Sequence, residues 1–530
     1  MKYPIGIQSF DQIIEDGYVY VDKTALIYSL AKEGKIYFLS RPRRFGKSLL
    51  VSTLKNYFLG RKELFKGLAI DRMEKDWHAY PVFHIDFNGR DFTRGGTLEQ
   101  VLEGYVSGWE EEYGLTGNKS PLVGDRFIRL LEHAHEQCGR RAVVLIDEYD
   151  KPILDVLDTN LETTVDDNRM LLEDRNRNVL KGFYSVFKAA DEHLQFVLLT
   201  GVTKFSQVSV FSGFNQPQDI SMDDQYGALC GIAQQELEHY FAESIDAMAQ
   251  KHRRSAEEMK QVLKRQYDGY HFSSELVDVY NPFSLLNAFK SKRIADFWFQ
   301  SGTPSYLIRL LNHTQENMDE LTGRFYSPEE FVDYKADVEK PLPMIYQSGY
   351  LTIKDYNMRR NTFLLDFPNN EVKNGFLTMV ASDYLKPKTS INSWTQDAVD
   401  ALQEGDTEKF RRLLTSFLSD IPYSMRRKEN EREKERYFHY TFYLLMRLIS
   451  VYTVYTEKQQ SEGRVDCIVE TGDYIYIFEF KLDGTADDAL RQIDEKGYAR
   501  PYLDDPRKLY RIGVSFSSET GTVDEWEAKG

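Results

Sequence analysis

Three consecutive residues, Gly46, Lys47 and Ser48, have the side-chain types that bind a nucleoside triphosphate. An apolar run at 36–39 precedes them and leucines at helical spacing follow, so the expected order is strand, turn and helix. In that geometry, backbone N–H groups at the helix start face the phosphates. The lysine ammonium reaches the β and γ oxygens, and the serine hydroxyl holds Mg²⁺. The turn therefore predicts a site for ATP and Mg²⁺.

The turn departs from the full phosphate-binding pattern, G-x-x-x-x-G-K-[ST], because Arg41 stands at the first glycine position. Less backbone freedom is expected as a result, together with a stronger positive field from Arg41, Arg43 and Arg44. We expect the residues of the turn itself to bind the nucleotide: Arg43, Arg44, Phe45, Gly46, Lys47, Ser48 and Leu49.

A second apolar run, 142–146, ends in two carboxylates, Asp147 and Glu148. A run that is apolar at every position predicts a strand buried on both faces of a parallel sheet. Ligands bind at the carboxyl ends of such strands in open α/β folds. Asp147 is then placed to support Mg²⁺, directly or through water, and Glu148 to polarise the attacking water. The alternative is that the two carboxylates begin a solvated loop.

Two further runs, 81–86 and 195–200, predict neighbouring strands of the same sheet. The second ends at Thr200, and Thr203 and Lys204 follow it. A polar side chain at this place can sense the γ-phosphate, although turn residues of the same types are common after strands. We take Thr200 as the nucleotide-binding candidate of this segment.

A different chemistry is indicated near the end of the chain. Residues 463–469 and 474–481 are β-rich runs joined by a glycine-containing turn, which predicts a hairpin. Period-two spacing puts Glu479 and Lys481 on one face of the second strand, and Asp466 on the partner strand can face them. Two carboxylates suit Mg²⁺, and a lysine beside them can orient water or stabilise charge on a phosphate. The alternative is an amphipathic strand with an exposed charge pair.

Segments from near the N-terminus to about residue 510 resemble a family of bacterial and archaeal AAA-ATPase-like proteins with a C-terminal PD-(D/E)XK nuclease-like domain. The matching segments are Y-V-D-K-T (20–24), R-P-R-R-F-G-K-S (41–48), L-I-D-E-Y-D (145–150), T-G-V-T-K-F-S (200–206), F-S-G-F-N (211–215), Y-D-G-Y-H-F (267–272), Y-N-P-F-S-L-L (280–286) and S-G-T-P (301–304). Arg41 in place of the glycine looks like the family's own pattern. The resemblance assigns Asp466, Glu479 and Lys481 to the nuclease constellation, and ATP and Mg²⁺ as cofactors.

The resemblance also implies additional residues around the nuclease-like site. This superfamily often supplies an extra acidic ligand from a helix, here the aromatic one that begins at Glu435, with Glu433 as an equal alternative. Gln492 and Tyr498 resemble family positions near the site. Because the fold also has binding-only members, cleavage is a separate question. The metal ligands expected in the two sites are Ser48, Asp147, Asp466, Glu479 and Glu435.

Length and composition set outer limits. At 530 residues the chain is long enough for three or four packed units. Its three cysteines lie far apart, which argues against a disulfide framework or a structural zinc site. The first residues contain no signal-peptide core, and no apolar run approaches the length of a membrane span. We therefore expect a cytoplasmic protein with no membrane partner.

The net charge of −16, from 83 acidic and 67 basic residues, excludes a uniform attraction to nucleic acid. Any contact with DNA must use local patches, and the candidates are residues 251–254 and 426–428. Both are equally typical of solvated helix faces. No segment indicates direct reading of a DNA sequence.

The fold class predicted is α/β, with a parallel-sheet P-loop NTPase (AAA-like) domain, a helical middle region and a restriction-endonuclease-like α/β C-terminal domain. The predicted boundaries are 1–230 for the ATPase domain, 231–310 for a helical lid or winged-helix-like region, 311–428 for a mostly helical connector and 429–530 for the nuclease-like domain. Within the middle, 232–265 and 281–299 read as helices, and 341–355 and 362–366 as short strands.

Three functions of different classes are compatible with these features. The leading one is an ATP-regulated, Mg²⁺-dependent nuclease acting on DNA. In this function ATP drives rearrangement or oligomerisation, so a homo-oligomer is one expected state. The second is a nucleotide-switched signalling or scaffold protein whose nuclease-like domain only binds. The third is an ATPase with a structural C-terminal domain.

Overall fold

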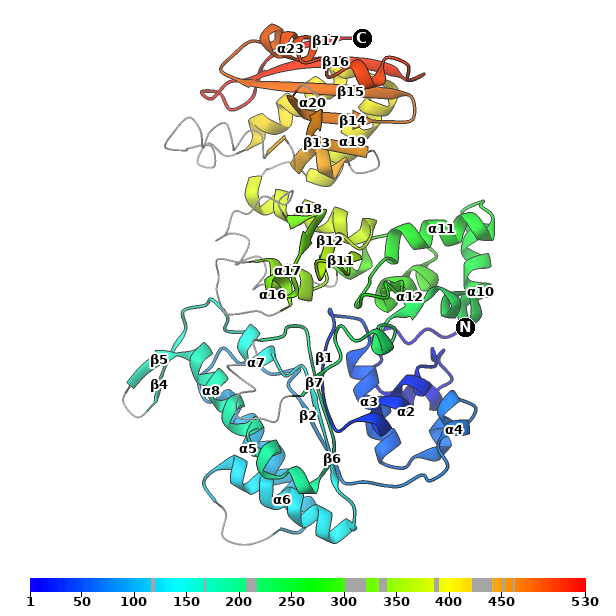
Figure 1. Ribbon diagram of the computed structural model, residues 1–530, viewed down its shortest axis with the longest axis vertical. Helices are drawn as coiled ribbons and strands as arrows, with labels where there is room; N and C mark the ends of the chain where they lie inside the picture. The colour runs from blue at the N-terminus through cyan, green and yellow to red at the C-terminus, as the bar shows by residue number, and fades with distance from the viewer. Residues whose placement is uncertain are drawn as a thin grey trace. The chain divides into compact units, whose positions relative to one another are not determined.

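The computed structural model describes residues 1–115, 120–165, 168–205, 217–300, 321–332, 341–385, 390–421, 441–442, 444–449, 453–460 and 463–530. They form two compact units, residues 1–373 and 374–530 (Figure 1). None of the helices in this described part combines the length and apolar content that a membrane crossing needs. The predicted domain boundaries at 230, 310 and 428 stay predictions.

A five-stranded parallel sheet lies at the centre of the first unit. Its strands, in spatial order, are β2 (Val82–Asp86), β3 (Ala142–Asp147), β6 (Leu194–Gly201), β1 (Ile36–Ser40) and β7 (Gln218–Asp219). Every neighbouring pair is parallel, and β3 is buried at all its positions. The predicted parallel sheet is confirmed, and its carboxyl ends share one edge, where β6 separates β1 from β3.

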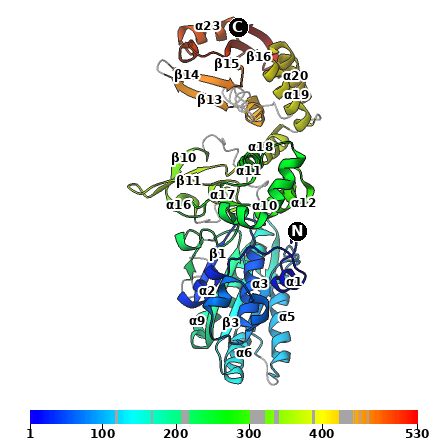
Figure 2. The ribbon, with the colours of Figure 1, turned by 90° about the vertical axis from the view of Figure 1, so that its right-hand side faces the viewer.

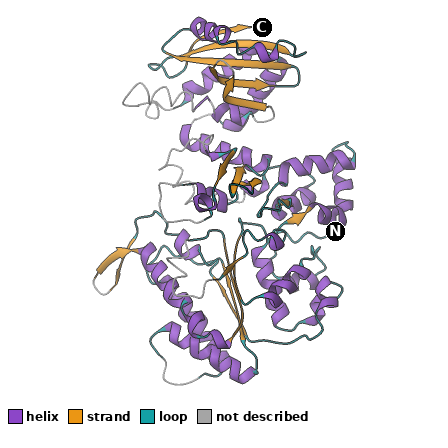
Figure 3. Ribbon diagram, viewed as in Figure 1, coloured by secondary structure: helices purple, strands orange, loops and turns teal. Residues whose placement is uncertain are grey.

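Helices cover both faces of this sheet, as Figures 1 and 3 show. One side carries α1 (Phe10–Glu15), α2 (Thr24–Glu33), α3 (Lys47–Phe58) and α4 (Ala69–Met73). The other carries α5 (Thr97–Glu112), α6 (Val123–Cys138) and α8 (Leu172–Tyr184). Short elements α7 (Lys151–Leu154), β4 (Glu162–Val165), β5 (Asn168–Leu171) and α9 (Val186–Ala189) connect them. Burial on both faces explains why residues 142–146 of β3 and 196–199 of β6 are continuously apolar and do not alternate.

A helical subdomain follows the sheet within the same unit. It contains β8 (Ile232–Ala233), α10 (Gln234–Lys251), α11 (Ala256–Tyr267), β9 (Val279–Tyr280), α12 (Pro282–Ser291) and α13 (Phe297–Gln300). Leu237, Met248 and Leu263 form its core with aromatic partners that include Phe241 and Phe289. Ser255 caps α11 by accepting a hydrogen bond from Glu258 N. The helices predicted at 232–265 and 281–299 are thus present.

The remainder of the first unit agrees with the prediction in part, because the strand predicted at 362–366 is present. It holds an antiparallel sheet in the order β10 (Arg324–Tyr326), β12 (Thr362–Asp366) and β11 (Thr352–Asn357), with helices α16 (Pro328–Phe331) and α17 (Leu342–Gln347). The strand predicted from residue 341 is wrong up to residue 347, where α17 lies. Pro341 and Pro343 sit at the helix start, which tolerates the missing N–H groups. The middle of the chain is therefore mixed, with a sheet beside its helices.

The second unit is built on a five-stranded mixed sheet. Its strands follow chain order: β13 (Thr453–Gln460), β14 (Gly463–Glu470), β15 (Tyr474–Leu482), β16 (Lys508–Phe516) and β17 (Val523–Lys529). The hairpin predicted for 463–481 is confirmed by the antiparallel pairing of β14 with β15. Only the β15–β16 pair is parallel among these described strands, and α23 (Ala486–Glu495) makes the crossover that such a pair requires.

The two faces of this sheet have different coverings (Figure 2). Ile475 and Ile477 pack with Leu490 and Ile493 of α23. The alternate side chains of β15 are aromatic and face α19 (Ile391–Glu404) and α20 (Thr407–Asp420), which follow α18 (Asn370–Leu385). Period-two alternation places Glu479 and Lys481 on the same face as Ile475, next to α23.

The close approach of α23 to β16 generates a test at Gly513. A Cβ on this residue would lie 2.1 Å from the Ala486 carbonyl oxygen and 3.0 Å from Leu490 Cγ. We expect Gly513→Ala to lower the free energy of unfolding of the second unit by about 1–3 kcal/mol, because backbone must shift to accept the methyl group. The matched control is Gly472→Ala, whose Cβ meets nothing within 4 Å. Equal denaturant midpoints for the two variants would contradict this packing.

Candidate nucleotide site and candidate nuclease site

The phosphate loop connects β1 to α3 at the carboxyl edge of the parallel sheet. Gly46 precedes α3 with φ +96°, and Arg44 is also left-handed with φ +69°. Glycine suits the first of these positions because a side chain there would be strained. The loop therefore curls back on itself, and the free N–H groups at the start of α3 face the cavity beside it.

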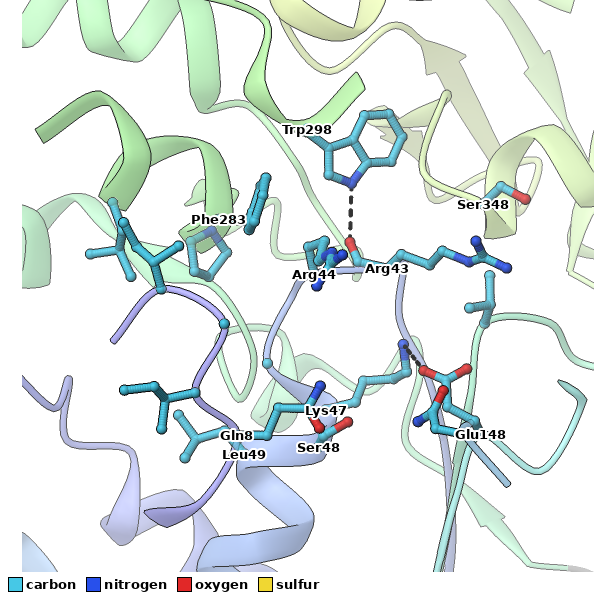
Figure 4. A pocket seen from close by; sticks show the side chains of 18 of the residues that line it. Gln8, Arg43, Arg44, Lys47, Ser48, Leu49, Glu148, Phe283, Trp298 and Ser348 are labelled. Atoms are coloured by element: carbon cyan, nitrogen blue, oxygen red, sulfur yellow. Dashed lines mark hydrogen bonds and ion pairs between the residues drawn. The ribbon is translucent and has the colours of Figure 1, made fainter. Parts of the chain in front are cut away.

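Lys47 lies at the centre of this site with only 4% of its surface exposed. Its ammonium donates to the carbonyl oxygen of Arg41 at 3.1 Å and lies 3.4 Å from Glu148 Oε1. Figure 4 shows the lysine side chain extended toward Glu148. The predicted phosphate-binding lysine and the predicted base for water, about a hundred residues apart in sequence, are therefore neighbours.

Asp147 and Thr200 meet at the ends of β3 and β6. The Thr200 hydroxyl donates to Asp147 Oδ1 at 2.5 Å, and both side chains are buried. The hydrogen bond fixes the orientation of the carboxylate that we predicted to support Mg²⁺. Thr200 is thus positioned through Asp147, and its role toward the γ-phosphate stays a prediction.

Asp150 is a structural residue that the sequence reading left without a role. Its carboxylate accepts hydrogen bonds from the Val202 and Thr203 N–H groups, at 2.9 and 2.6 Å, and from the Thr203 hydroxyl at 2.7 Å. Burial, with Glu148 nearby, raises the pKa of Asp150 to about 6. These bonds join the turn after β3 to the turn after β6. The second aspartate of D-E-Y-D was the available signal for this link.

Arg41 does not add its charge to the phosphate loop as expected. Its guanidinium is buried and donates to the carbonyl oxygens of Ser221 at 2.7 Å and Tyr226 at 3.1 Å. It also lies 4.2 Å from the ring centroid of Phe272. Burial lowers the pKa of this guanidinium. Arg41 therefore ties the end of β1 to two later segments and replaces glycine for a packing reason.

A cavity of about 430 Å³ opens in front of the loop. Its lining includes the polar residues Arg43, Arg44, Lys47, Ser48 and Glu148, and the apolar residues Pro4, Ile5, Ile7, Leu49, Pro282 and Leu286. Polar side chains suit phosphates and apolar ones suit a nucleobase. Gly46 also lines the cavity, whereas the side chains of Phe45, Asp147 and Thr200 are buried behind it.

The candidate nuclease site lies where β14 and β15 diverge. Asp466 N donates to Glu479 Oε2 at 3.5 Å, and Phe480 N donates to Asp466 Oδ2 at 2.9 Å. Lys481 follows on the same face as Glu479. The two carboxylates and the lysine predicted from the sequence are therefore together.

Gln492 of α23 connects the charged residues of this site. Its side-chain oxygen accepts from Lys481 Nζ at 2.6 Å, while its amide nitrogen donates to Glu479 Oε1. Burial and the Asp466 carboxylate raise the pKa of Glu479 to about 8. Tyr498 is buried beside the site, and burial raises its pKa. A cation between the two carboxylates would relieve their repulsion, so this donor set fits Mg²⁺.

Glu435 and its alternative Glu433 lie outside the described residues. Within the described part of the chain, no group of three or more His, Cys, Asp or Glu side chains is arranged to hold a metal ion.

Two family models match this chain. The one described as predicted AAA-ATPase matches residues 4–211, and the one for the PD-(D/E)XK nuclease superfamily matches residues 433–526. A relative, the uncharacterized protein in the vnfD 5' region of Azotobacter chroococcum mcd 1, is 35% identical over 534 residues, which cover 98% of each chain. The chain belongs to this family of predicted AAA-ATPases with a C-terminal PD-(D/E)XK domain.

Two solved structures show a weak likeness to this AAA-ATPase family member. Cdc6p from Pyrobaculum aerophilum is 12% identical with a TM-score of 0.22, over 68% of this chain and 91% of its own. The ORC1 protein of Aeropyrum pernix, solved in complex with DNA, is 11% identical with a TM-score of 0.24, over 67% and 90%. At these TM-scores the likeness carries no conclusion about this chain.

The candidate nucleotide pocket includes residues that local sequence patterns did not reveal. Trp298 of α13 donates from Nε1 to the Arg43 carbonyl oxygen at 3.1 Å, as Figure 4 shows, and Phe283 lies 5.0 Å from the Arg44 guanidinium. Ser348 also lines the pocket. These residues follow the phosphate loop by more than two hundred positions, so only the tertiary fold brings them to it.

A buried carboxylate holds Trp298 in place. Glu371 Oε1, at the start of α18, accepts a hydrogen bond from Trp298 N at 2.7 Å. Burial raises the pKa of Glu371 to about 8, from an ordinary value of 4.5. The folded protein therefore holds this proton at neutral pH.

Glu371 makes the stability of the first unit depend on pH. Because the pKa of Glu371 is higher in the folded protein than in the unfolded chain, its protonated form stabilises the fold. This stabilisation is complete below pH 4.5 and is lost as the pH rises to about 8. The isosteric Glu371→Gln variant keeps the acceptor and does not titrate. We therefore expect its melting temperature to gain on wild type by a few degrees between pH 5 and pH 9. The melting temperature of the control Glu275→Gln, at an exposed residue, should equal that of wild type at each pH. A melting-temperature difference between Glu371→Gln and wild type that does not change with pH would contradict the raised pKa of Glu371.

Proposed function

We propose that this protein binds and hydrolyses ATP with Mg²⁺, and that its PD-(D/E)XK domain is a Mg²⁺-dependent nuclease for DNA. ATP would control the nuclease or its assembly. The observation that carries the proposal is the chain of contacts from Glu479 through Gln492 to Lys481, with Asp466 adjacent. The polar arrangement in front of Lys47 supports the nucleotide part.

In the nucleotide site, Ser48 and Asp147 would hold Mg²⁺, which neutralises charge on the β and γ phosphates. Lys47 would bind the same phosphate oxygens. Phosphates that reach its ammonium compete with Glu148, which lies 3.4 Å away. Nucleotide binding would thereby release the Glu148 carboxylate to polarise the attacking water. Thr200 holds Asp147 in orientation throughout.

In the nuclease site, Asp466 and Glu479 would hold Mg²⁺, which activates water and stabilises charge on the scissile phosphate. Lys481 would orient the attacking water or stabilise the negative charge that develops on the phosphate oxygens. Gln492 fixes the lysine through a 2.6 Å hydrogen bond. The loss of a proton from Glu479 must accompany metal binding, because its pKa is raised to about 8.

The nucleotide part is tested at Lys47. Removing its ammonium deletes a charge-assisted contact to the phosphates, so we expect Lys47→Ala to weaken ATP binding roughly 10- to 100-fold. Isothermal titration of the full chain with ATP and Mg²⁺ measures the effect. The exposed Lys62→Ala serves as control, and unchanged affinity in Lys47→Ala would exclude this loop as the site.

The nuclease part is tested by cleavage of plasmid and single-stranded DNA with Mg²⁺ or Mn²⁺, with and without ATP. We expect the isosteric Glu479→Gln to lower the rate at least about 100-fold, because one metal ligand is lost. Glu495→Gln, on the exposed side of α23, should cut as wild type does. If the cleavage rate of Lys47→Ala no longer changes with ATP, the nucleotide site controls the nuclease site.

Absence of cleavage under all these conditions, with ATP still bound, would overturn the nuclease. It would favour a nucleotide-switched signalling or scaffold protein whose PD-(D/E)XK domain only binds. The predicted cytoplasmic location and a homo-oligomeric state stay predictions.

A further inference from the structure

The C-terminal ends of α10 and α12 meet on the surface of the helical subdomain. Lys251 Nζ donates to the Ser291 carbonyl oxygen at 3.4 Å, and His252 Nε2 donates to the Lys292 carbonyl oxygen at 3.2 Å. Figure 1 shows the two helices side by side. Two basic segments that are well separated in the sequence therefore form one surface.

This basic surface consists of Lys251, His252, Arg253, Arg254, Lys290, Lys292 and Arg293, all of them exposed. None of its lysines and arginines makes an ion pair with an acidic residue in the described part of the chain. The carboxylates that follow in sequence are engaged elsewhere: Glu257 pairs with Lys260 at 2.6 Å, and Glu258 accepts from Ser255 at 2.8 Å. The hydrogen bonds from Ser255, and then the charge of Arg254, lower the pKa of Glu258. Six lysines and arginines gathered on a chain of net charge −16 still need an explanation.

Both helix ends place a basic residue where glycine is usual. Arg253 and Lys292 are left-handed, with φ +54° and +52°. In each case the next residue donates the backbone hydrogen bond that ends a helix in a Schellman motif. Arg254 N donates to the Ala249 carbonyl oxygen at 3.0 Å, and Arg293 N donates to the Ala288 carbonyl oxygen at 3.3 Å. Glycine would adopt this conformation without strain. The fold does not require a cation at either position.

Stabilisation of the helix dipoles does not account for the whole set. A cation in the last turn interacts favourably with the free carbonyl groups there, which covers Lys251 and Lys290. Arg253, Arg254, Lys292 and Arg293 lie at or beyond the helix ends. Their charges are available to a ligand.

We propose that the basic surface binds the phosphate backbone of double-stranded DNA; this deepens the proposed action on DNA and rests on it. Exposed lysine and arginine side chains gathered at two adjoining helix ends suit a regular array of phosphates. The surface carries no phenylalanine, tyrosine or tryptophan ring on which single-stranded bases would stack and no apolar side chain to enter a membrane. Contact to phosphates alone implies binding without sequence preference.

The test uses the full chain and a 30-base-pair duplex, with binding measured by fluorescence anisotropy in EDTA at 50–200 mM NaCl. The first variant is Arg253→Gly with Lys292→Gly, which removes two charges and suits the left-handed backbone. A second variant adds Arg254→Gln and Arg293→Gln. We expect the slope of log affinity against log salt to fall by about 1 for each cation removed. Affinity at 100 mM salt should fall at least about tenfold in the second variant.

The matched control is Lys62→Gln with Lys66→Gln, Arg72→Gln and Lys75→Gln, four exposed cations of the same unit. It should bind as wild type does, and all variants should retain their ATP affinity and melting temperature. Equal loss in control and test variants, unchanged affinity in the test variants, or no binding by wild type would each overturn the proposal. Tighter binding to vesicles of anionic lipid than to duplex in the same buffer would also overturn it.

Binding in EDTA separates this inference from the nuclease. Duplex bound through the basic surface but never cut with Mg²⁺ would overturn the nuclease and leave the surface intact. Cleavage that is unaffected by the four-residue variant, with unchanged affinity, would overturn the surface and leave the nuclease intact.

Discussion

Charge that is buried at the carboxyl edge of the parallel sheet is the constraint on which the first unit depends. Lys47, Asp147 and Asp150 are almost fully enclosed, and an enclosed charge is costly unless partners surround it. Glu148 and the loop carbonyls contact the lysine, while the end of β6 and the turn after it contact the two aspartates. The same contacts align the groups that a nucleotide would use, so the compensation of charge and the shape of the site have one origin.

In the second unit a neutral residue, Gln492, contacts the buried charged groups. Asp466 and Glu479 repel each other in a buried setting, and the pKa of Glu479 rises to about 8. Gln492 offers an amide nitrogen to the carboxylate and an oxygen to Lys481, which spaces the charges without cancelling them. A cation bound between the two carboxylates would relieve this repulsion. Because α23 supplies the glutamine, the docking of that helix at Gly513 decides the geometry.

The sequence predicted some strands of the fold correctly and others not. The runs that became β3 and β6 were recognisable because burial on both faces requires continuous apolar sequence, and E-x-K marked one strand face by simple alternation. The strand predicted from residue 341 was wrong up to residue 347, because its prolines lie at the start of α17. Arg41 was expected to strengthen the positive field of the phosphate loop, but its guanidinium donates hydrogen bonds to buried carbonyl oxygens.

The sequence by itself determined the two chemistries and the strands that carry them, since residue type and local period are enough to specify both. Only the tertiary structure decided which distant groups complete each site. Trp298 reaches the Arg43 carbonyl, and Asp150 joins two strand ends. The ends of α10 and α12 merge two short basic segments into one surface. Such contacts depend on chain segments far apart in sequence, and no local pattern encodes which of them will meet.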